Sequence, residues 1–386
     1  MRVLHVPTAT GGHPTTLARA EREIGLESWS IVDQETYLAY PADEVVLRRD
    51  ANRLWLELHR PGLLFRACRD FDVIHFNAGQ TLMPQPMTRS AGRHAALPRA
   101  LHRAYARVLE QRDLPLLRAL GKAIVVTFQG DDARRGDVLA TRPVSPLGEV
   151  EPGYYDATSD RLKQRRVARF ARHADRILAL NPDLLDVLPP GARFVPYANV
   201  DPRDWQPVAA PPSEAPLVLH APSHRGVKGT RHVLEAVRTL EQEGVPFRFR
   251  LVERVSHAEA RRLYEQADLL VDQLLVGWYG GLAVELMLLG KPVVAYVADA
   301  DLARVPDEMR DGLPVVRAEP SSLTGVLRTL LTERRHELPR LGQRSRAWAE
   351  RWHDPVAIAR MMEEEYRAAL AAVAARRQGL PAERHG

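Results

Sequence analysis

The sequence holds a single cysteine, Cys68, among 386 residues. One cysteine excludes an intramolecular disulfide and a cysteine-rich zinc site, and it is typical of a reducing compartment. No apolar run approaches the ~20 residues that span a bilayer, and the opening letters "MRVLHVPTATGG" have no signal-peptide pattern. The composition therefore predicts a cytoplasmic protein.

Aromatic residues are also scarce, at 6%, whereas hydrophobic residues make up 45% of the chain and charged residues 27%. This is the balance of an ordinary globular protein, so long disordered segments are not expected away from the ends. A chain of this length is too long for one ordinary core, and two domains of about 150 to 200 residues are expected.

The net charge is +5, and the basic residues are unevenly distributed along the chain. They form two clusters, a first over residues 89–112 and a second over residues 161–176. Both fit a solvated helix face, or attraction to an anionic membrane surface or an acidic acceptor. Nucleic acid is not expected, because no aromatic residues interleave with the arginines. The first cluster consists of Arg89, Arg93, Arg99, Arg103, Arg107 and Arg112, with Arg99, Arg103 and Arg107 on one helical face.

Apolar strand-like runs alternate with helical patterns in both halves of the chain. In the first half they cover residues 2–7, 72–76 and 123–128, and in the second they restart at 216–221. The proline-rich stretch 202–216 between the halves has the composition of a linker. This alternation predicts an α/β protein with two doubly wound parallel sheets, whose ligands bind at the carboxyl ends of the strands.

A glycine-containing basic loop, "HAPSHRGVKGT", leaves the first strand of the second half and enters a helix. Arg225 and Lys228 supply positive charge, and Gly226 and Gly229 let the backbone turn closely. Fixed cations beside the free N–H groups of a helix start suit a diphosphate. The alternative is an exposed basic turn.

A second loop, "VGWYGGLAVELMLLGKPVV", has the same position after a later strand. If a helix begins near Gly281, the N–H groups of Gly280, Gly281 and Leu282 form an anion site. Glu285, one turn further on, could accept hydrogen bonds from the vicinal hydroxyls of a ribose. The alternative is a tight strand-to-helix turn followed by a surface acid.

With these two loops in place, the chain resembles the retaining GT-B glycosyltransferases of family 4. The match in the second loop covers Tyr279, Gly280, Glu285 and residues 290–293, and Gly11 and Gly12 stand where the family has its first glycine loop. The order and spacing of these blocks extend over nearly the whole chain.

The resemblance implies a GT-B fold, with two Rossmann-like domains facing across a cleft. Residues 1–200 would bind the acceptor and residues 201–354 the donor, and a helix over about residues 355–378 would cross back onto the first domain. It implies transfer of a hexose-type sugar, with retention, from a nucleoside diphosphate donor, expected to be UDP, to a hydroxyl acceptor. Neither a metal nor a cofactor is expected, because cations and a helix dipole neutralise the leaving diphosphate.

The resemblance also assigns roles to single residues. Arg225 and Lys228 would hold the diphosphate, and Glu285 the ribose. The loop of Tyr279, Gly280, Gly281 and Leu282 would contact the phosphates or the sugar, and Gly11 and Gly12 would approach the donor from the first domain. The catalytic set expected on this basis is Gln129, Arg225, Lys228 and Glu285.

Three departures from the family pattern limit what is carried over. Gly277 stands where the family has its first signature glutamate, and Gln129 replaces a histidine that follows a strand. Only one helix fits between the strands of residues 247–252 and 267–273, so residues 253–256 are expected to rebuild the wall around the nucleotide base. The alternative function is therefore a catalytically impaired nucleotide-sugar or glycan-binding protein. A GT-B epimerase fits less well, because the departures remove acids and histidines.

Other polar residues near strand ends have two interpretations each. Asp131 and Asp132 fit either acceptor binding or a salt-bridged helix start, and His75 fits a packed strand-end histidine better than a catalytic one. Trp278 fits either stacking on a ligand or packing within its loop. The acceptor stays open among glycans, glycolipids and secondary metabolites, as does a peripheral contact with the inner face of an anionic membrane.

Overall fold

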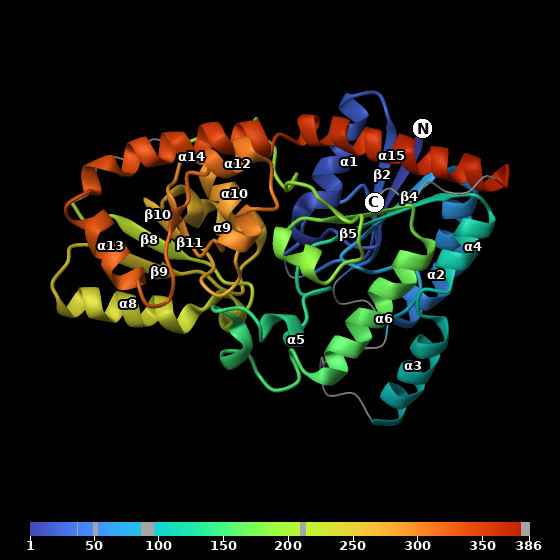
Figure 1. The fold of residues 1–386 in the computed structure, drawn as a ribbon, viewed down its shortest axis with the longest axis horizontal. Coiled ribbons are helices and arrows are strands. Elements are labelled where there is room, and N and C mark those ends of the chain that lie inside the picture. Colours follow the sequence, from blue (N-terminus) through green and yellow to red (C-terminus); the bar gives the residue numbers. More distant parts are fainter. Residues whose placement is uncertain (37, 49–52, 86–95, 209–213, 380–386) are drawn as a thin grey trace.

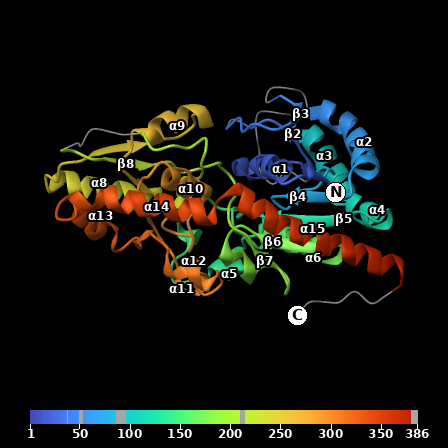
Figure 2. The same cartoon turned by 90° about the horizontal axis from the view of Figure 1, so that it is seen from above.

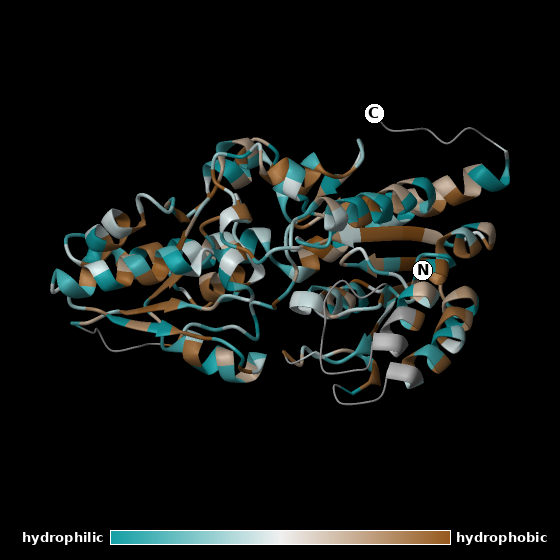
Figure 3. Cartoon of the chain, turned by 90° about the horizontal axis from the view of Figure 1, so that it is seen from below, coloured by the Kyte–Doolittle hydropathy of each residue, from teal (hydrophilic) through white to brown (hydrophobic). Residues whose placement is uncertain are grey.

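The computed structural model describes residues 1–36, 38–48, 53–85, 96–208 and 214–379; for residues 53, 54 and 96–100 it describes the backbone alone. The described residues form two parallel β-sheets, one in each half of the molecule (Figure 1). Figure 3 shows hydrophobic residues gathered on the strands inside both domains and hydrophilic residues on the outer helices.

The first sheet has seven parallel strands in the order β3-β2-β1-β4-β5-β6-β7. Its strand order reverses between β1 and β4, which is the point where ligands bind in open α/β sheets. The strands are β1 (Arg2–Val6), β2 (Glu27–Gln34), β3 (Glu44–Leu47), β4 (Val73–Asn77), β5 (Ala123–Phe128), β6 (Arg176–Ala179) and β7 (Arg193–Phe194). The helices between them are α1 (His13–Glu23), α2 (Arg53–Asp70), α3 (Ala96–Leu109), α4 (Asp113–Ala119), α5 (Gly136–Leu139) and α6 (Ala157–His173).

The second sheet has five parallel strands in the order β12-β11-β10-β8-β9, and its order reverses between β8 and β10. Only α9 lies between β9 and β10, as the spacing predicted. The strands are β8 (Leu217–His220), β9 (Arg248–Leu251), β10 (Leu269–Val271), β11 (Val293–Ala295) and β12 (Val316–Arg317). The helices are α7 (Arg225–Lys228), α8 (Thr230–Gln242), α9 (His257–Glu265), α10 (Gly281–Leu288), α11 (Asp299–Leu302), α12 (Asp307–Asp311), α13 (Leu323–Leu331) and α14 (Leu338–Trp352).

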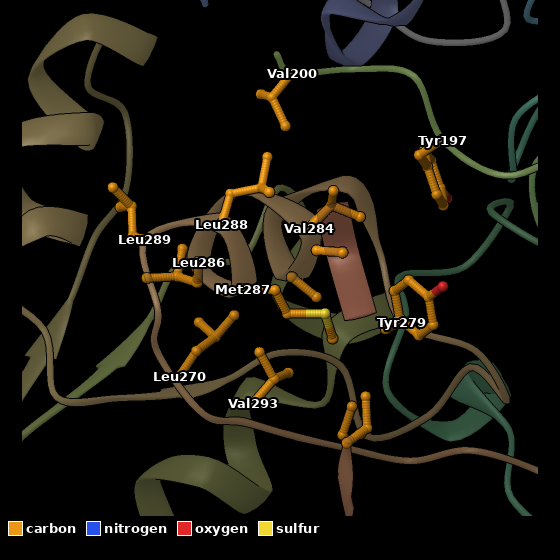
Figure 4. Packing of buried hydrophobic residues seen from close by; sticks show 14 of the residues in the cluster. Tyr197, Val200, Leu270, Tyr279, Val284, Leu286, Met287, Leu288, Leu289 and Val293 are labelled. Carbon is orange, nitrogen blue, oxygen red and sulfur yellow. The ribbon is translucent and has the colours of Figure 1, made fainter. Parts of the chain in front are cut away.

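Helix α10 is apolar except at Glu285, and it is buried from Ala283 to its end. Its Met287 packs with Leu270 of β10 and Val293 of β11, and its outer side packs against α14 and Val200, which follows β7 (Figure 4). A helix buried in this way is held rigidly. Its first residues therefore stand at a fixed place at the edge of the sheet.

The last helix, α15 (Pro355–Arg377), leaves the second domain and runs along the first (Figures 1 and 2). Ile358, Met362 and Tyr366 pack with Leu17 of α1 and Val125 of β5. The helix therefore belongs to the core of the first domain, although it follows the second domain in sequence.

A buried polar network fixes α15 to the first sheet. Glu21 of α1 accepts hydrogen bonds from Tyr366 Oη at 2.7 Å and from Ser28 Oγ at 2.6 Å, and its Oε2 lies 2.8 Å from His5 Nε2. The same tyrosine hydroxyl lies 2.8 Å from Nδ1 of His75, whose pKa is lowered well below its ordinary value by burial and by the nearby His5. His5 and His75 are thus packed structural histidines, and for His75 this is the interpretation that the sequence favoured.

We predict that Tyr366→Phe destabilises the protein by about 2 kcal/mol, because it leaves the buried Glu21 carboxylate without one of its donors. Tyr296→Phe is the matched control, since the Tyr296 side chain is buried and no hydrogen bond to its hydroxyl occurs among the described residues. Urea unfolding of the two variants measures the difference. Equal midpoints would contradict the role given to the network.

Candidate functional site

A cavity of about 330 Å³ lies between the carboxyl ends of the two sheets. The loops after β1, β2, β5 and β6 and the segment after β7 form its first-domain side. The loops after β8 and β9 and the start of α10 form its second-domain side. Of the residues that the sequence predicted for the site, the cavity is lined by Gly11, Gln129, Lys228, Gly280, Gly281, Leu282 and Glu285.

The Gly11-Gly12 loop brings the start of α1 to the cavity. Both glycines have positive φ angles, 64° and 76°, which strain any other residue. A Cβ atom on Gly12 would lie 3.1 Å from the carbonyl oxygen of Asn199 and 3.2 Å from the Tyr40 ring, whereas one on Gly11 would meet nothing. Gly11 therefore faces the cavity, and Gly12 does not line it but allows close packing against Asn199, which follows β7.

His13, which follows these glycines, lines the cavity and was not singled out from the sequence. The Ala198 N–H donates to its Nδ1 at 2.9 Å. Burial, with smaller contributions from His5 and His353, lowers the pKa of His13 to about 3. The ring is therefore neutral at ordinary pH and carries its proton on Nε2, as a fixed hydrogen-bond donor.

The loop after β5 contributes one free side chain and two occupied acids. Gln129 Nε2 is buried and has no hydrogen-bond partner among the described residues, although Gln129 lines the cavity. The Asp131 carboxylate accepts hydrogen bonds from Tyr154 Oη and Tyr155 Oη, at 2.5 Å each, and from Arg134 at 2.8 Å. Burial raises its pKa, but Arg134 and the two tyrosines bring it below the ordinary value.

Asp132 is occupied as well, because it accepts hydrogen bonds from the N–H groups of Gln129 and Gly130. Both acids therefore hold the loop in shape, which is the structural interpretation of the pair. Neither carboxylate is left free to remove a proton from a substrate.

On the second-domain side of the cavity, Lys228 ends α7 and points to the carboxyl end of β10. Its Nζ lies 3.2 Å from Asp272 Oδ1 and 2.6 Å from Gln273 Oε1. The Gly280 N–H donates to the other Asp272 oxygen at 2.7 Å, so the expectation that this N–H is free for a ligand is wrong. Among the described residues, no hydrogen bond engages the N–H groups of Gly281 and Leu282, which remain for an anion.

Glu285 lies one turn inside α10 with its side chain almost wholly buried. His257 Nε2 of α9 lies 3.0 Å from its Oε1, and burial raises the pKa of Glu285 although His257 lowers it. The His257 ring lies between Tyr40 and Trp205, at centroid distances of 4.7 Å and 5.7 Å. The first domain thus reaches across the cavity to the residue that orients this carboxylate.

Besides Gly12, two predicted site residues do not line the cavity. Arg225 projects from α7 into a neighbouring hollow, with its side chain 60% exposed, and pairs with Glu253 at 2.8 Å. Tyr279 is fully buried, and its hydroxyl lies 2.9 Å from His353 Nε2. Its ring fills the core between α10 and α14, so its place in the site is corrected to one of packing, which is also the role of the buried Trp278.

Gly277 lies at a contact between the two domains rather than in the cavity lining. A Cβ atom there would lie 2.2 Å from Asp301 Oδ2. That carboxylate pairs with Arg142 Nη1 at 2.7 Å, and Arg142 Nη2 also binds Asp186 at 2.6 Å. An ion pair across the domains therefore fills the space that a side chain at position 277 would need.

We predict that Gly277→Ala destabilises the protein by about 1 to 3 kcal/mol, because the new methyl group collides with the buried Asp301 carboxylate. Gly277→Glu is expected to be worse, and it does not restore the acid of the family pattern. Gly325→Ala in α13 is the control, since its Cβ meets nothing within 4 Å and alanine favours a helix. Thermal unfolding measures all three, and a neutral Gly277→Ala would contradict the packing.

Among the described residues, no group of three or more His, Cys, Asp or Glu side chains is placed to hold a metal ion. Within the same residues, no helix is long and apolar enough to cross a membrane.

Comparison with known proteins gives matches to solved structures only, since no family model and no curated protein matches the sequence. Sucrose-phosphate synthase from Thermosynechococcus elongatus aligns over 96% of this chain and 100% of its own, with 16% identity and a TM-score of 0.60. HepE from Anabaena, in a complex with UDP and glucose, aligns over 95% and 100%, with 14% identity and a TM-score of 0.57.

The catalytic domain of starch synthase IV from Arabidopsis thaliana, bound to ADP and acarbose, aligns over 96% of this chain and 99% of its own, with 11% identity and a TM-score of 0.58. At such identities the likeness establishes the fold. The chain has the GT-B fold, which confirms the fold class predicted from the sequence.

Proposed function

We propose that this GT-B chain is a retaining glycosyltransferase of the family 4 type, which transfers a hexose-type sugar from a nucleoside diphosphate, expected to be UDP, to a hydroxyl acceptor. The observation that carries the proposal is the donor side of the cavity. Lys228, the unpaired N–H groups at the start of α10 and the buried Glu285 carboxylate all line it. Two structures of similar fold contain a nucleoside diphosphate, UDP in one and ADP in the other.

The donor diphosphate would lie between Lys228 and the N-terminus of α10. An ammonium group supplies a full charge, and the N–H groups of Gly281 and Leu282 add directed hydrogen bonds and the positive end of the helix dipole. Asp272 holds Lys228 and the Gly280 N–H in one arrangement. Charge that develops on the leaving diphosphate is then stabilised by groups already in position, without a metal.

Glu285 would accept hydrogen bonds from the two ribose hydroxyls. An ionised carboxylate only accepts hydrogen bonds, so it suits a pair of neighbouring donors. His257, fixed between Tyr40 and Trp205, keeps the carboxylate oriented in the absence of a ligand. Arg225, at the rim, would contribute long-range attraction for the anionic donor.

The first-domain side of the cavity offers hydrogen bonds for sugar and acceptor hydroxyls. His13 Nε2–H and Gln129 Nε2 are donors, and Asn199 Oδ1 is a buried acceptor that has no partner in the part of the chain that the structure describes. None of these groups is a good general base, because His13 has a pKa of about 3 and the amides do not titrate. These side chains are therefore poor candidates for accepting the proton of the acceptor hydroxyl.

The proton of the acceptor is therefore proposed to pass to the leaving group. The acceptor oxygen bonds to the anomeric carbon on the face that the phosphate leaves, the bond from this carbon to the phosphate oxygen breaks, and that phosphate oxygen takes the acceptor proton. Retention follows from attack on the same face. The protein has only to position the reactants and stabilise charge.

A second candidate function is a nucleotide-sugar or glycan-binding protein with impaired catalysis. The favouring observation is that the space beside Gly277 is filled by the Arg142–Asp301 pair and that Gln129 cannot titrate. A screen of UDP, GDP, ADP and CMP sugars for donor hydrolysis or transfer separates the two functions. Glycan, glycolipid and secondary-metabolite acceptors all fit the chemistry.

The donor side is tested by calorimetry with UDP and UDP-glucose. We predict that Lys228→Met and Glu285→Gln each weaken binding at least tenfold, since each removes a charge-assisted contact of about 1.5 to 3 kcal/mol. Arg225→Gln, at the exposed rim, has a smaller effect, and Glu364→Gln, on the exposed face of α15, has none. Unchanged affinities for UDP and UDP-glucose in both cavity variants would defeat the proposed site.

The pH dependence of donor binding tests the role of Glu285. Burial raises the pKa of Glu285, so the carboxylate takes up its proton at a higher pH than an ordinary glutamate as the pH falls. Protonation removes an acceptor, and UDP affinity is predicted to fall between about pH 8 and about pH 5 by more in the wild type than in Glu285→Gln. The protonation of UDP itself affects both proteins equally. Parallel curves of UDP affinity against pH for the wild type and Glu285→Gln would therefore contradict the prediction.

A further inference from the structure

Exposed apolar side chains gather on one part of the first domain. Eight of the twelve large apolar side chains that are exposed in the described part of the chain lie in or next to α2, α3 and α4. In Figures 1 and 2 these helices lie on the first domain, away from the second. The eight residues are Trp55, Leu58, Phe65, Leu101, Tyr105, Val108, Leu116 and Leu120.

Helix α3 presents its exposed apolar residues as one stripe. Leu101, Tyr105 and Val108 are spaced four and three residues apart, so they share one face, and Leu101 and Val108 are 64% and 63% exposed. Tyr105 Oη donates to Glu57 Oε2 of α2 at 2.9 Å, which sets this stripe beside the exposed Leu58 of α2. Two neighbouring helices thus show apolar residues to the outside.

The other flank of α3 is basic and has no compensating acid. Arg103 and Arg107 are exposed, and no ion pair or hydrogen bond to either occurs among the described residues. The sequence from residue 73 to residue 109 contains no acidic residue at all. Arg89 and Arg93 of the predicted basic cluster lie outside the described residues.

The basic surface continues onto α6. Glu110, just beyond α3, pairs with Arg166 and Arg169 of α6. Helix α6 also carries the exposed Arg161 and Arg165, and no ion pair to either occurs among the described residues. An apolar stripe flanked by unpaired arginines is the pattern of a surface that lies in a membrane interface.

We propose that the outer face of α2 and α3 docks the chain on an anionic phospholipid membrane, with Leu58, Leu101 and Val108 in the interface and Arg103 and Arg107 on the headgroups. Apolar side chains bury among the acyl chains, and each arginine is attracted by the negative surface potential. The donor cavity, between the two domains, would remain in water. This inference does not depend on the proposed chemistry.

The charge pattern favours this occupant over the others. An apolar stripe does not match a nucleic-acid backbone, which is recognised by cations and stacking aromatics. A second copy of the chain would bring the same arginines against themselves across a two-fold axis, and like charges repel. A fluid anionic surface satisfies both the apolar and the basic flank at once.

Vesicle flotation with the full chain tests the proposal, using vesicles of phosphatidylcholine alone and vesicles with roughly 30% phosphatidylglycerol at low salt. We expect binding to the anionic vesicles only. The double variant Arg103→Gln/Arg107→Gln is expected to weaken vesicle binding roughly thirtyfold, because each arginine contributes roughly fivefold. Leu101→Ser/Val108→Ser is expected to weaken it at least tenfold at every salt concentration.

Matched controls change the same residue types elsewhere. Arg238→Gln/Arg344→Gln removes two exposed arginines from the second domain, and Val208→Ser/Met361→Ser removes two exposed apolar side chains. Both controls are expected to bind like the wild type. The proposal would be overturned if the wild type did not bind anionic vesicles, or if the α3 variants bound them as tightly as the wild type does. It would also be overturned if ultracentrifugation showed that the α3 substitutions abolish self-association of the chain and leave vesicle binding unchanged.

Discussion

The buried carboxylate of Asp272, at the carboxyl end of β10, joins the two loops on which the donor side depends. One oxygen binds Lys228 at the end of α7, and the other accepts the Gly280 N–H at the start of α10. Without it, a flexible lysine and a helix N-terminus would be independent of each other. Because both are fixed to one group, a positive charge and a set of N–H donors face the same volume before any ligand arrives. In the proposed anion site, an acid is therefore part of the preorganisation.

The cavity depends equally on contacts that cross between the domains. Asn199, which follows β7, donates to the Gly281 carbonyl, and the backbone N–H of His257 in α9 donates to the Leu38 carbonyl. Arg142 binds Asp301. These contacts surround the cavity at separate places. Burial raises the pKa of Asp301, and Arg142 offsets the cost of burying this charge. The arrangement of the two sheets is thus determined by polar groups that line or surround the candidate site.

Much of the fold follows from the sequence, because buried parallel strands are short apolar runs with turn residues between them. The glycine loops could be predicted as well, and Lys228, Gly281, Leu282, Glu285 and Gln129 do meet in one cavity. The local sequence pattern does not indicate which residues a side chain contacts in the folded protein. Arg225 turns to Glu253, and Tyr279 fills the core against α14, although both belong to the loops that the pattern identified. His13 has no visible signal beyond its place after two glycines, since the N–H that fixes its tautomer lies 185 residues further along the chain.

The most direct measurement of the central claim is a crystal structure of the chain with a bound nucleotide sugar. The account predicts that the diphosphate lies between Lys228 Nζ and the N–H groups of Gly281 and Leu282, with the ribose hydroxyls on Glu285. A nucleotide bound elsewhere, or in this cavity with its phosphates away from the start of α10, would contradict it.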